Sequence, residues 1–263
     1  MHIGSFALPA FPFFWSRLKI KLYFRLCRVF FHLLTGLSAC AFVFPWASHA
    51  LRDRVTQSWS RRLVGICGVT VTPSTGVAAL AHAMVVANHV SWLDIFVINA
   101  LYPCRFVAKS EIREWPVLGW LADKAGTVFL ARGNRRDLRQ IFKGLVHKLE
   151  QGERVAFFPE GTTAAQGSLL PFHANLFEAA VDAGVMVQPY AVSYVDASGA
   201  LHPSIEFIGE MTFAESMVAI LSGPAVTARV VCMEPIDAAG AHRRDVCAAA
   251  HAAVGTALGH KPG

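Results

Sequence analysis

The sequence predicts an α/β fold, in which a mixed, largely parallel sheet is flanked by helices and preceded by an N-terminal membrane-associated helical pair. From about Cys67 onward, short apolar runs alternate with helical patterns, which is typical of a parallel or mixed sheet covered by helices. Before that point, five cations and no acidic residue lie between Met1 and Arg28, and nothing is charged between Val29 and Leu51. We therefore expect membrane-docking helices in residues 1–66 and an α/β domain in residues 67–263.

The composition favours contact with lipid and with an anionic partner. Hydrophobic residues make up 54% of the chain, charged residues 16%, and the mean hydropathy is +0.42. The net charge of +6 fits a phospholipid surface, a nucleotide-bearing donor or an acidic carrier protein. Nucleic acid would suit the same charge, but the chain contains no nucleic-acid-binding module. None of the six cysteines forms a C-x-x-C pair, which argues against a zinc site or a disulfide framework and favours the reducing cytoplasmic side.

The uncharged N-terminal run is long enough to span a bilayer or to lie deep in one leaflet. Two other interpretations fit parts of it: a cleaved secretory signal ending near Ser48-His49-Ala50, or a helix buried in a protein core. Pro45 should end or kink this helix. A second helix is expected over about Ala50–Ile66, with its arginines near the lipid head groups.

The following domain should contain eight strands and a well-defined amphipathic helix. The helix follows Asn134 as N-cap, repeats its apolar residues at helical spacing from Leu138 to Leu149, and stops at Gly152. A C-terminal helix is expected over about Ala241–Leu258. The expected strands are Val69–Thr72, Met84–Ala87, Arg105–Ala108, Thr127–Leu130, Val155–Phe158, Val187–Tyr194, Ile205–Ile208 and Thr227–Met233.

The segment from Asn88 to Asp94 follows an apolar strand and leads into an apolar helix. Open α/β sheets place their ligands at such corners. A histidine five residues before an aspartate (the HX4D pattern) can form a pair in which Asp94 orients the imidazole of His89 and stabilises it after proton transfer. The same residues also fit an ordinary helix N-terminus with Ser91 as its cap. N–H groups at the start of this helix are candidates for stabilising an oxyanion.

A second corner follows the strand that ends near Phe158, where Pro159, Glu160, Gly161 and Thr162 form a turn. This turn places a carboxylate and a hydroxyl at the sheet edge. Glu160 could hydrogen-bond a polyol, and the backbone at Gly161 could approach a phosphate closely. A plain solvated turn is the alternative.

These stretches together resemble the bacterial lysophosphatidate (1-acylglycerol-3-phosphate) acyltransferase family, the glycerolipid acyltransferases. The resemblance covers roughly residues 84–195 and comprises four blocks in order. The blocks are Asn88-His89 through Ser91 to Asp94; Ala108–Ile112 with Pro116, Gly119 and Gly126–Arg132; Phe158–Thr162; and Val187–Val192. The basic and apolar N-terminal helices also resemble the membrane-docking pair of that family.

The resemblance implies a role for each matching residue. His89 would be the general base and Asp94 its partner. Glu160, Gly161 and Thr162 would bind the glycerol-phosphate of the acceptor, and Arg132 would contact its phosphate. The same blocks make Lys109, Asn88 and Ser91 candidate substrate-binding residues. The resemblance implies no metal and no organic cofactor, with acyl-CoA or acyl-carrier protein as co-substrate.

Three positions depart from the family pattern, and at one of them Asn175 stands where members often have glycine. Thr163 stands where members often have arginine, and His173 stands where they often have lysine. Two cations that commonly serve a phosphate are therefore absent, so either Lys109, Arg132, Arg135 and His173 compensate, or the acceptor is not a phosphomonoester. The departures bear on the acceptor head group rather than on the class of reaction.

The sequence thus predicts an enzyme of the inner (cytoplasmic) membrane, with its active site on the cytoplasmic side. It would transfer a fatty acyl group from a thioester to 1-acylglycerol-3-phosphate, making phosphatidic acid in phospholipid biosynthesis. A lyso-ornithine lipid or a general lysophospholipid is the alternative acceptor.

A serine hydrolase would require a G-x-S-x-G motif, which the chain lacks, and Ser91 lies too close to His89 to serve as its nucleophile. A non-catalytic lipid-binding or carrier-docking domain is the remaining alternative. Beyond the lysolipid and the bilayer, acyl-carrier protein is a possible partner, and nucleic acid is not expected.

Overall fold

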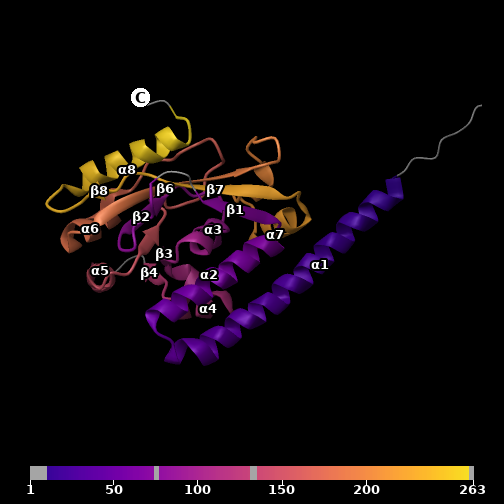
Figure 1. Ribbon diagram of the computed structural model, residues 1–263, viewed down its shortest axis with the longest axis horizontal. Helices are drawn as coiled ribbons and strands as arrows, with labels where there is room; N and C mark the ends of the chain where they lie inside the picture. Colours follow the sequence, from indigo (N-terminus) through magenta and orange to yellow (C-terminus); the bar gives the residue numbers. More distant parts are fainter. Residues whose placement is uncertain (1–10, 74–76, 131–134, 261–263) are drawn as a thin grey trace, which may run out of the picture.

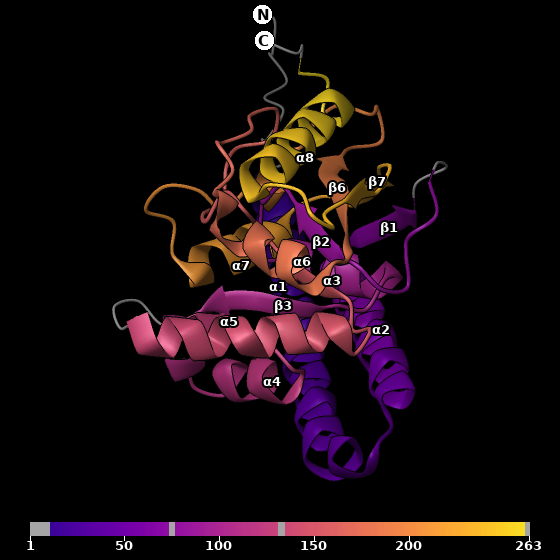
Figure 2. The ribbon, with the colours of Figure 1, turned by 90° about the vertical axis from the view of Figure 1, so that its left-hand side faces the viewer.

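The computed structural model describes residues 11–73, 77–130 and 135–260, with side chains in these ranges except for 11–18 and 135–140. A long N-terminal helix lies along one side of a sheet that carries helices on both faces (Figures 1 and 2). The α-helices are α1 (Phe11–Ser38), α2 (His49–Ile66), α3 (Asp94–Leu101), α4 (Leu118–Lys124), α5 (Arg135–Glu150), α6 (Glu178–Ala183), α7 (Phe213–Ser222) and α8 (Arg243–Ala257). The strands are β1 (Val69–Pro73), β2 (Met84–Ala87), β3 (Arg105–Lys109), β4 (Val128–Leu130), β5 (Val155–Phe157), β6 (Met186–Val195), β7 (Val226–Cys232) and β8 (Ile236–Asp237).

The sheet is mixed and mostly parallel, as predicted. Its order is β1-β7-β6-β2-β5-β3-β4, with β8 pairing to β6. The run β6-β2-β5-β3-β4 is parallel throughout, and β1 is parallel to β7. The antiparallel pairs are β6 with β7 and β6 with β8. Because parallel strands end at the same edge, the carboxyl ends of β2, β5, β3 and β4 lie together.

Each face of the sheet carries its own core, because successive strand residues point to opposite faces. In β2, Val85 and Ala87 pack with buried residues of α2, α3 and α7, whereas Met84 and Val86 pack with those of α5, α6 and α8. All four side chains of β2 are buried, which explains why this strand reads as an uninterrupted apolar run.

The N-terminal segment is a helical hairpin whose first arm faces outward. The stretch Lys19–Trp46 is long and apolar enough to cross a membrane, and only 22% of its most apolar window is buried. This low burial contradicts the alternative of a core helix. The turn falls where Pro45 was expected to break the helix: a short 3-10 turn, Phe44–Trp46, ends there, and Ser48 caps α2. A boundary between separate domains at residue 66 stays a prediction.

Two cations of α1 attach this helix to the body of the protein. Lys21 donates to the carbonyl of Gly223 at 2.7 Å, and Arg25 donates to the carbonyl of Leu221 at 3.0 Å. These carbonyls lie at the C-terminal end of α7, where the helix dipole favours positive charge. Part of the basic leader therefore binds protein rather than lipid.

The expected strand at Ile205–Ile208 is wrong. Pro203–Ile205 forms a 3-10 turn capped by His202, and the chain then passes beside the turn that follows β2. The N–H of Phe207 donates to the carbonyl of Val90, and its carbonyl accepts the Thr163 hydroxyl. These contacts satisfy the backbone at Phe207 without a strand ladder. The short strand β8 was not expected, since two residues leave no periodic pattern.

Candidate active site

The two predicted corners meet at the carboxyl edge of the parallel strands. His89 follows β2, and Glu160 follows the adjacent strand β5. Lys109 ends β3, the next strand along, and its side chain is exposed. The sheet order thus brings together three predicted site residues that are up to 71 positions apart in the chain.

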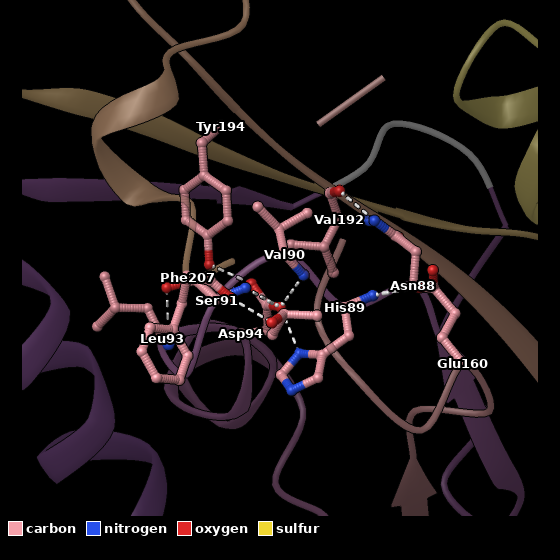
Figure 3. Close-up of polar contacts among 11 residues, drawn as sticks. Asn88, His89, Val90, Ser91, Leu93, Asp94, Glu160, Val192, Tyr194 and Phe207 are labelled. Carbon is pink, nitrogen blue, oxygen red and sulfur yellow. Dashed lines mark hydrogen bonds and ion pairs between the residues drawn. The ribbon is translucent and has the colours of Figure 1, made fainter. Parts of the chain in front are cut away.

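The predicted contact between His89 and Asp94 is confirmed. Nδ1 of His89 lies 2.8 Å from Oδ2 of Asp94, and the two side chains point toward each other (Figure 3). Asp94 is fully buried, whereas the His89 side chain keeps 18% of its surface exposed. If Nδ1 carries the proton that Asp94 accepts, Nε2 is left with its lone pair free to take a proton. Their roles in catalysis stay predictions.

The carboxylate of Asp94 is surrounded by donors. Its Oδ2 also accepts the N–H groups of Val90 at 2.7 Å and of Ser91 at 2.9 Å. These bonds wrap the turn around the carboxylate and stabilise its charge in a buried place. They also engage two of the N–H groups expected to be available for an oxyanion, and that of Leu93 donates to the Ser91 hydroxyl. These three N–H groups already have acceptors, and an oxyanion role for the N–H groups at the start of α3 stays a prediction.

The other oxygen of Asp94 is bonded from across the sheet. Tyr194, near the end of β6, donates its hydroxyl to Oδ1 at 2.6 Å. Tyr194 is fully buried, and burial together with the Asp94 charge raises its pKa well above the usual value, so it remains a donor. The sequence reasoning missed this residue, because only the pairing of β6 with β2 brings it to the turn.

Glu160 is buried beneath the His89 turn instead of extending into solvent. Its Oε1 accepts the backbone N–H of His89 at 2.7 Å, and its Oε2 accepts that of Leu170 at 2.9 Å. Burial raises the pKa of this carboxyl, although the two N–H donors act in the opposite direction. Glu160 thus links the two corners of the site, and a contact with the acceptor stays a prediction.

Phe158 supplies a wall for the imidazole. Its ring lies against that of His89, and it also stacks on Phe106 from β3 at a centroid distance of 5.7 Å. Sequence reasoning treated Phe158 as the end of a strand and the first residue of a family block, without a contact to His89. The alternation of side chains along that strand could have indicated that it faces away from Phe157.

Asn88 and Ser91 shape the turn from inside. The Asn88 amide donates to the carbonyl of Val192 and accepts its N–H, so it extends the pairing between β2 and β6 beyond the strand (Figure 3). Ser91 is fully buried, and its hydroxyl accepts from Leu93. Their contact with substrate, which the resemblance implied, stays a prediction.

The rim of the site is more open. Gly161 and Thr162 are exposed beside Glu160, and Gly161 has a positive φ of 70° that favours glycine. The Thr163 hydroxyl donates to the carbonyl of Phe207. His173 is exposed, and a Cβ placed on Gly161 would lie 3.4 Å from its Cδ2. Arg132 lies outside the described residues, as does Asn134, the expected cap of α5.

The arrangement presents an oriented imidazole at the edge of the sheet. Within residues 11–73, 77–130 and 135–260, no group of three or more His, Cys, Asp or Glu residues is placed to hold a metal ion. His89 combines a buried, oriented Nδ1 with a partly exposed ring at the sheet edge. This geometry suits removal of a proton from a substrate hydroxyl.

Comparison with known proteins identifies relatives over most of the chain. The acyltransferase family model matches residues 68–193. A lyso-ornithine lipid O-acyltransferase of Pseudomonas aeruginosa is 37% identical over 246 residues, which cover 91% of this chain and 94% of that protein. A 1-acyl-sn-glycerol-3-phosphate acyltransferase of Neisseria meningitidis is 44% identical over 163 residues, which cover 61% of this chain and 63% of that protein.

A solved structure has the same fold. The crystal structure of the 1-acyl-sn-glycerophosphate acyltransferase of Thermotoga maritima aligns with a TM-score of 0.61 and 22% sequence identity. The alignment covers 94% of this chain and 98% of that one, so the N-terminal hairpin and the sheet domain both take part in the match.

Proposed function

This chain belongs to the acyltransferase family, and we propose that it acylates the free hydroxyl of 1-acylglycerol-3-phosphate to make phosphatidic acid. The contact between His89 and Asp94, with the imidazole partly exposed at the sheet edge, carries the proposal. Family membership makes the protein an acyltransferase, and the orientation and partial exposure of the His89 imidazole support its role as the base for transfer to a hydroxyl.

The proposed reaction needs one proton acceptor and no covalent enzyme intermediate. The acceptor oxygen attacks the thioester carbonyl while Nε2 of His89 takes its proton. A C–O bond forms, the C–S bond breaks, and the imidazolium returns the proton to the leaving thiolate. Asp94 stabilises the imidazolium in between, and general-base assistance of this kind contributes about 10²- to 10⁴-fold.

The acceptor is proposed from the relatives and from the rim of the site. Neisseria meningitidis and Neisseria gonorrhoeae proteins named 1-acyl-sn-glycerol-3-phosphate acyltransferase are 44% and 50% identical to the part of this chain that they match. Lys109, Gly161 and His173 are exposed at or near the sheet edge, where they would meet an anionic head group. Arg132, Glu160 and Thr162 are proposed to complete the acceptor site.

A lyso-ornithine lipid is the second candidate acceptor, and a specific observation favours it. The Pseudomonas aeruginosa relative carries that name and matches 91% of this chain. Thr163 and His173 stand where phosphate-binding members often have arginine and lysine. An ornithine head group carries an amine that offsets its carboxylate, so it depends less on cations of the protein than a phosphomonoester does.

The membrane location that we propose for the enzyme follows from the chemistry of its substrates. Both the acceptor and the acyl donor carry long apolar chains, so a site beside a bilayer meets them where they dissolve. We propose that the outward face of Lys19–Trp46 binds the inner membrane, with the active site on its cytoplasmic side. Acyl-CoA and acyl-carrier protein are the proposed donors, and no cofactor is required by this chemistry.

The test gives purified protein in lipid a panel of lysolipids with acyl-CoA or acyl-carrier donors. We expect a second chain on 1-acylglycerol-3-phosphate with at least one donor, and no turnover by the His89→Ala variant, which should still bind lipid. Preferential acylation of lyso-ornithine lipid would replace the proposed acceptor with the second candidate. An acyl group trapped covalently on Ser91, or full turnover by His89→Ala, would overturn the mechanism.

A further inference from the structure

The two oxygens of Asp94 have separate partners. Oδ2 accepts from His89, Val90 and Ser91, all within the turn that precedes Asp94 itself. Among the described contacts, Oδ1 accepts from Tyr194 alone, at 2.6 Å. The hydroxyl of Tyr194 is therefore the long-range bond that this carboxylate makes, 100 residues away along the chain.

This bond determines which way the carboxylate faces. Partial rotation of the Asp94 carboxylate about its Cβ–Cγ bond would carry Oδ1 away from the Tyr194 hydroxyl, and a fully buried, charged oxygen without a donor is costly. The Tyr194 hydroxyl provides that donor from β6, a central strand paired with both β2 and β7. The bond therefore connects the start of α3 to a central strand of the sheet (Figure 3).

We propose that Tyr194 is a positioning residue of the acyl transfer, which holds Asp94 so that Oδ2 faces Nδ1 of His89. The inference rests on the proposed roles of His89 and Asp94 as base and partner. Tyr194 touches neither substrate nor the proton in transfer. It acts through Asp94 by fixing the plane of the carboxylate and by withdrawing part of its negative charge.

The charge effect has a direction that can be measured. Without the Tyr194 hydroxyl, the carboxylate bears its full charge toward the imidazole, and His89 holds a proton more strongly. The free base then forms at higher pH, so the acidic limb of the profile of kcat/KM against pH should move upward. The other titratable groups near this bond are Glu160 after β5 and Cys67 after α2, and neither changes in the test.

The chain provides a matched control on the same strand. Tyr190 lies four residues before Tyr194 on β6 and is equally buried, but its hydroxyl has no hydrogen-bond partner among the described residues. Replacement of either tyrosine by phenylalanine removes one buried hydroxyl and keeps the ring. Only Tyr194→Phe removes a donor to Asp94.

The experiment measures kcat, KM and the pH profile for wild type, Tyr194→Phe, Tyr190→Phe and His89→Ala in lipid. For Tyr194→Phe we expect kcat to fall about 10- to 100-fold, as for loss of a buried hydrogen bond to a charge. Its KM for the lysolipid should change little and its acidic limb should move upward, while Tyr190→Phe behaves as wild type. Wild-type kcat and pH profile in Tyr194→Phe, or equal losses in both variants, would overturn the inference.

Two further outcomes separate this inference from its premise. If His89→Ala is inactive and Tyr194→Phe is not impaired, only the role of Tyr194 is wrong. If His89→Ala retains turnover, the catalytic pair itself is wrong and the inference falls with it.

Should Tyr194→Phe fail to fold, 3-fluorotyrosine at position 194 keeps the hydroxyl and makes it a stronger donor. The acidic limb should then move to lower pH, and an unchanged limb would contradict the proposal.

Discussion

The imidazole of His89 lies flat against the phenyl ring of Phe158, with centroids 3.8 Å apart and planes within 5° of parallel. Phe158 contacts the face of the ring, and Asp94 bonds its Nδ1. Glu160 holds the backbone of the same residue by accepting its N–H. A base held in this way loses little entropy when it reacts, because its orientation is set before substrate arrives.

Replacement of Phe158 by leucine should lower turnover more than stability. The smaller side chain leaves the imidazole free to tilt, and we expect kcat to fall about 10-fold, since small displacements of a reacting group are costly. Phe157→Leu is the control, because Phe157 packs on Phe177 at the opposite face of the sheet. That variant should lose stability but keep its kcat per folded molecule. A larger loss of kcat in Phe157→Leu than in Phe158→Leu would contradict the positioning role of Phe158.

Glu160→Gln should distinguish a positioning role from a substrate-binding one. Both Glu160 oxygens accept backbone N–H groups, so an amide must direct its own NH₂ at one of them. The misplaced donor should cost about 1–3 kcal/mol, lowering both the melting temperature and kcat. Glu206→Gln is the control, since Glu206 accepts the N–H of Gln166 and not that of His89. A rise in KM for the acceptor with kcat and stability unchanged would instead indicate a substrate ligand.

Stability should depend on Glu153 in moderate acid. Burial alone would raise the pKa of this carboxyl, but the charge of Lys148 and hydrogen bonds from Lys148 and Arg105 lower it overall from 4.5. A depressed folded-state pKa means that the stabilisation is present above pH 4.5 and is lost as pH falls through the lower folded value. Wild type should therefore melt higher than Glu153→Gln at pH 7, and the gap should close toward pH 3. A gap that stays constant over this range, or an equal effect in the exposed Glu210→Gln control, would refute the assignment.

Replacement of His173 by lysine should shift acceptor preference toward a phosphate. His173 is exposed beside Gly161, and lysine at this position adds a full charge at the rim of the site. We expect kcat/KM for 1-acylglycerol-3-phosphate to rise about 2- to 5-fold, as for one exposed ion pair, with no gain for lyso-ornithine lipid. The control His147→Lys adds the same charge at an exposed position of α5. Equal gains in both variants would point to net charge rather than to this position.

Membrane binding should depend on the turn of the N-terminal hairpin. Phe42 and Trp46 are 77% and 89% exposed, so a double replacement by serine removes no core packing. We expect binding to phosphatidylglycerol vesicles, measured by sedimentation, to weaken about 10-fold or more because two large apolar side chains leave the lipid. Leu201→Ser serves as the control, since Leu201 is also exposed but lies in the loop after β6. Unchanged sedimentation of the double variant would exclude this surface from the lipid contact.

Local sequence patterns were sufficient for most of the elements and for the central pair. His89 and Asp94 are five residues apart in one tight turn, so their meeting depends on contacts within the turn. The apolar run of β2 and the helical spacing in α5 are likewise local signals, and both predicted elements are confirmed. Pro45 lies in the 3-10 turn Phe44–Trp46 where the helical segment stops, since its ring and missing N–H act on the neighbouring turn.

The segment at Ile205–Ile208 shows where such signals fail. Its apolar residues suit a strand, but a strand also needs a partner with a free edge. In the folded chain the backbone of Phe207 is bonded to Val90 and Thr163 instead. Whether an apolar run becomes a strand is therefore decided by what lies beside it.

The sequence by itself determined that a histidine and an aspartate would face each other after a buried strand, in an acyltransferase-like order of blocks. Only the tertiary structure decided what surrounds them: Tyr194 on Asp94, Phe158 against the imidazole, and Glu160 beneath its backbone. The physical reason is the order and register of the strands. They bring residues 69 to 100 positions apart into contact, and no local periodicity along the chain encodes that pairing.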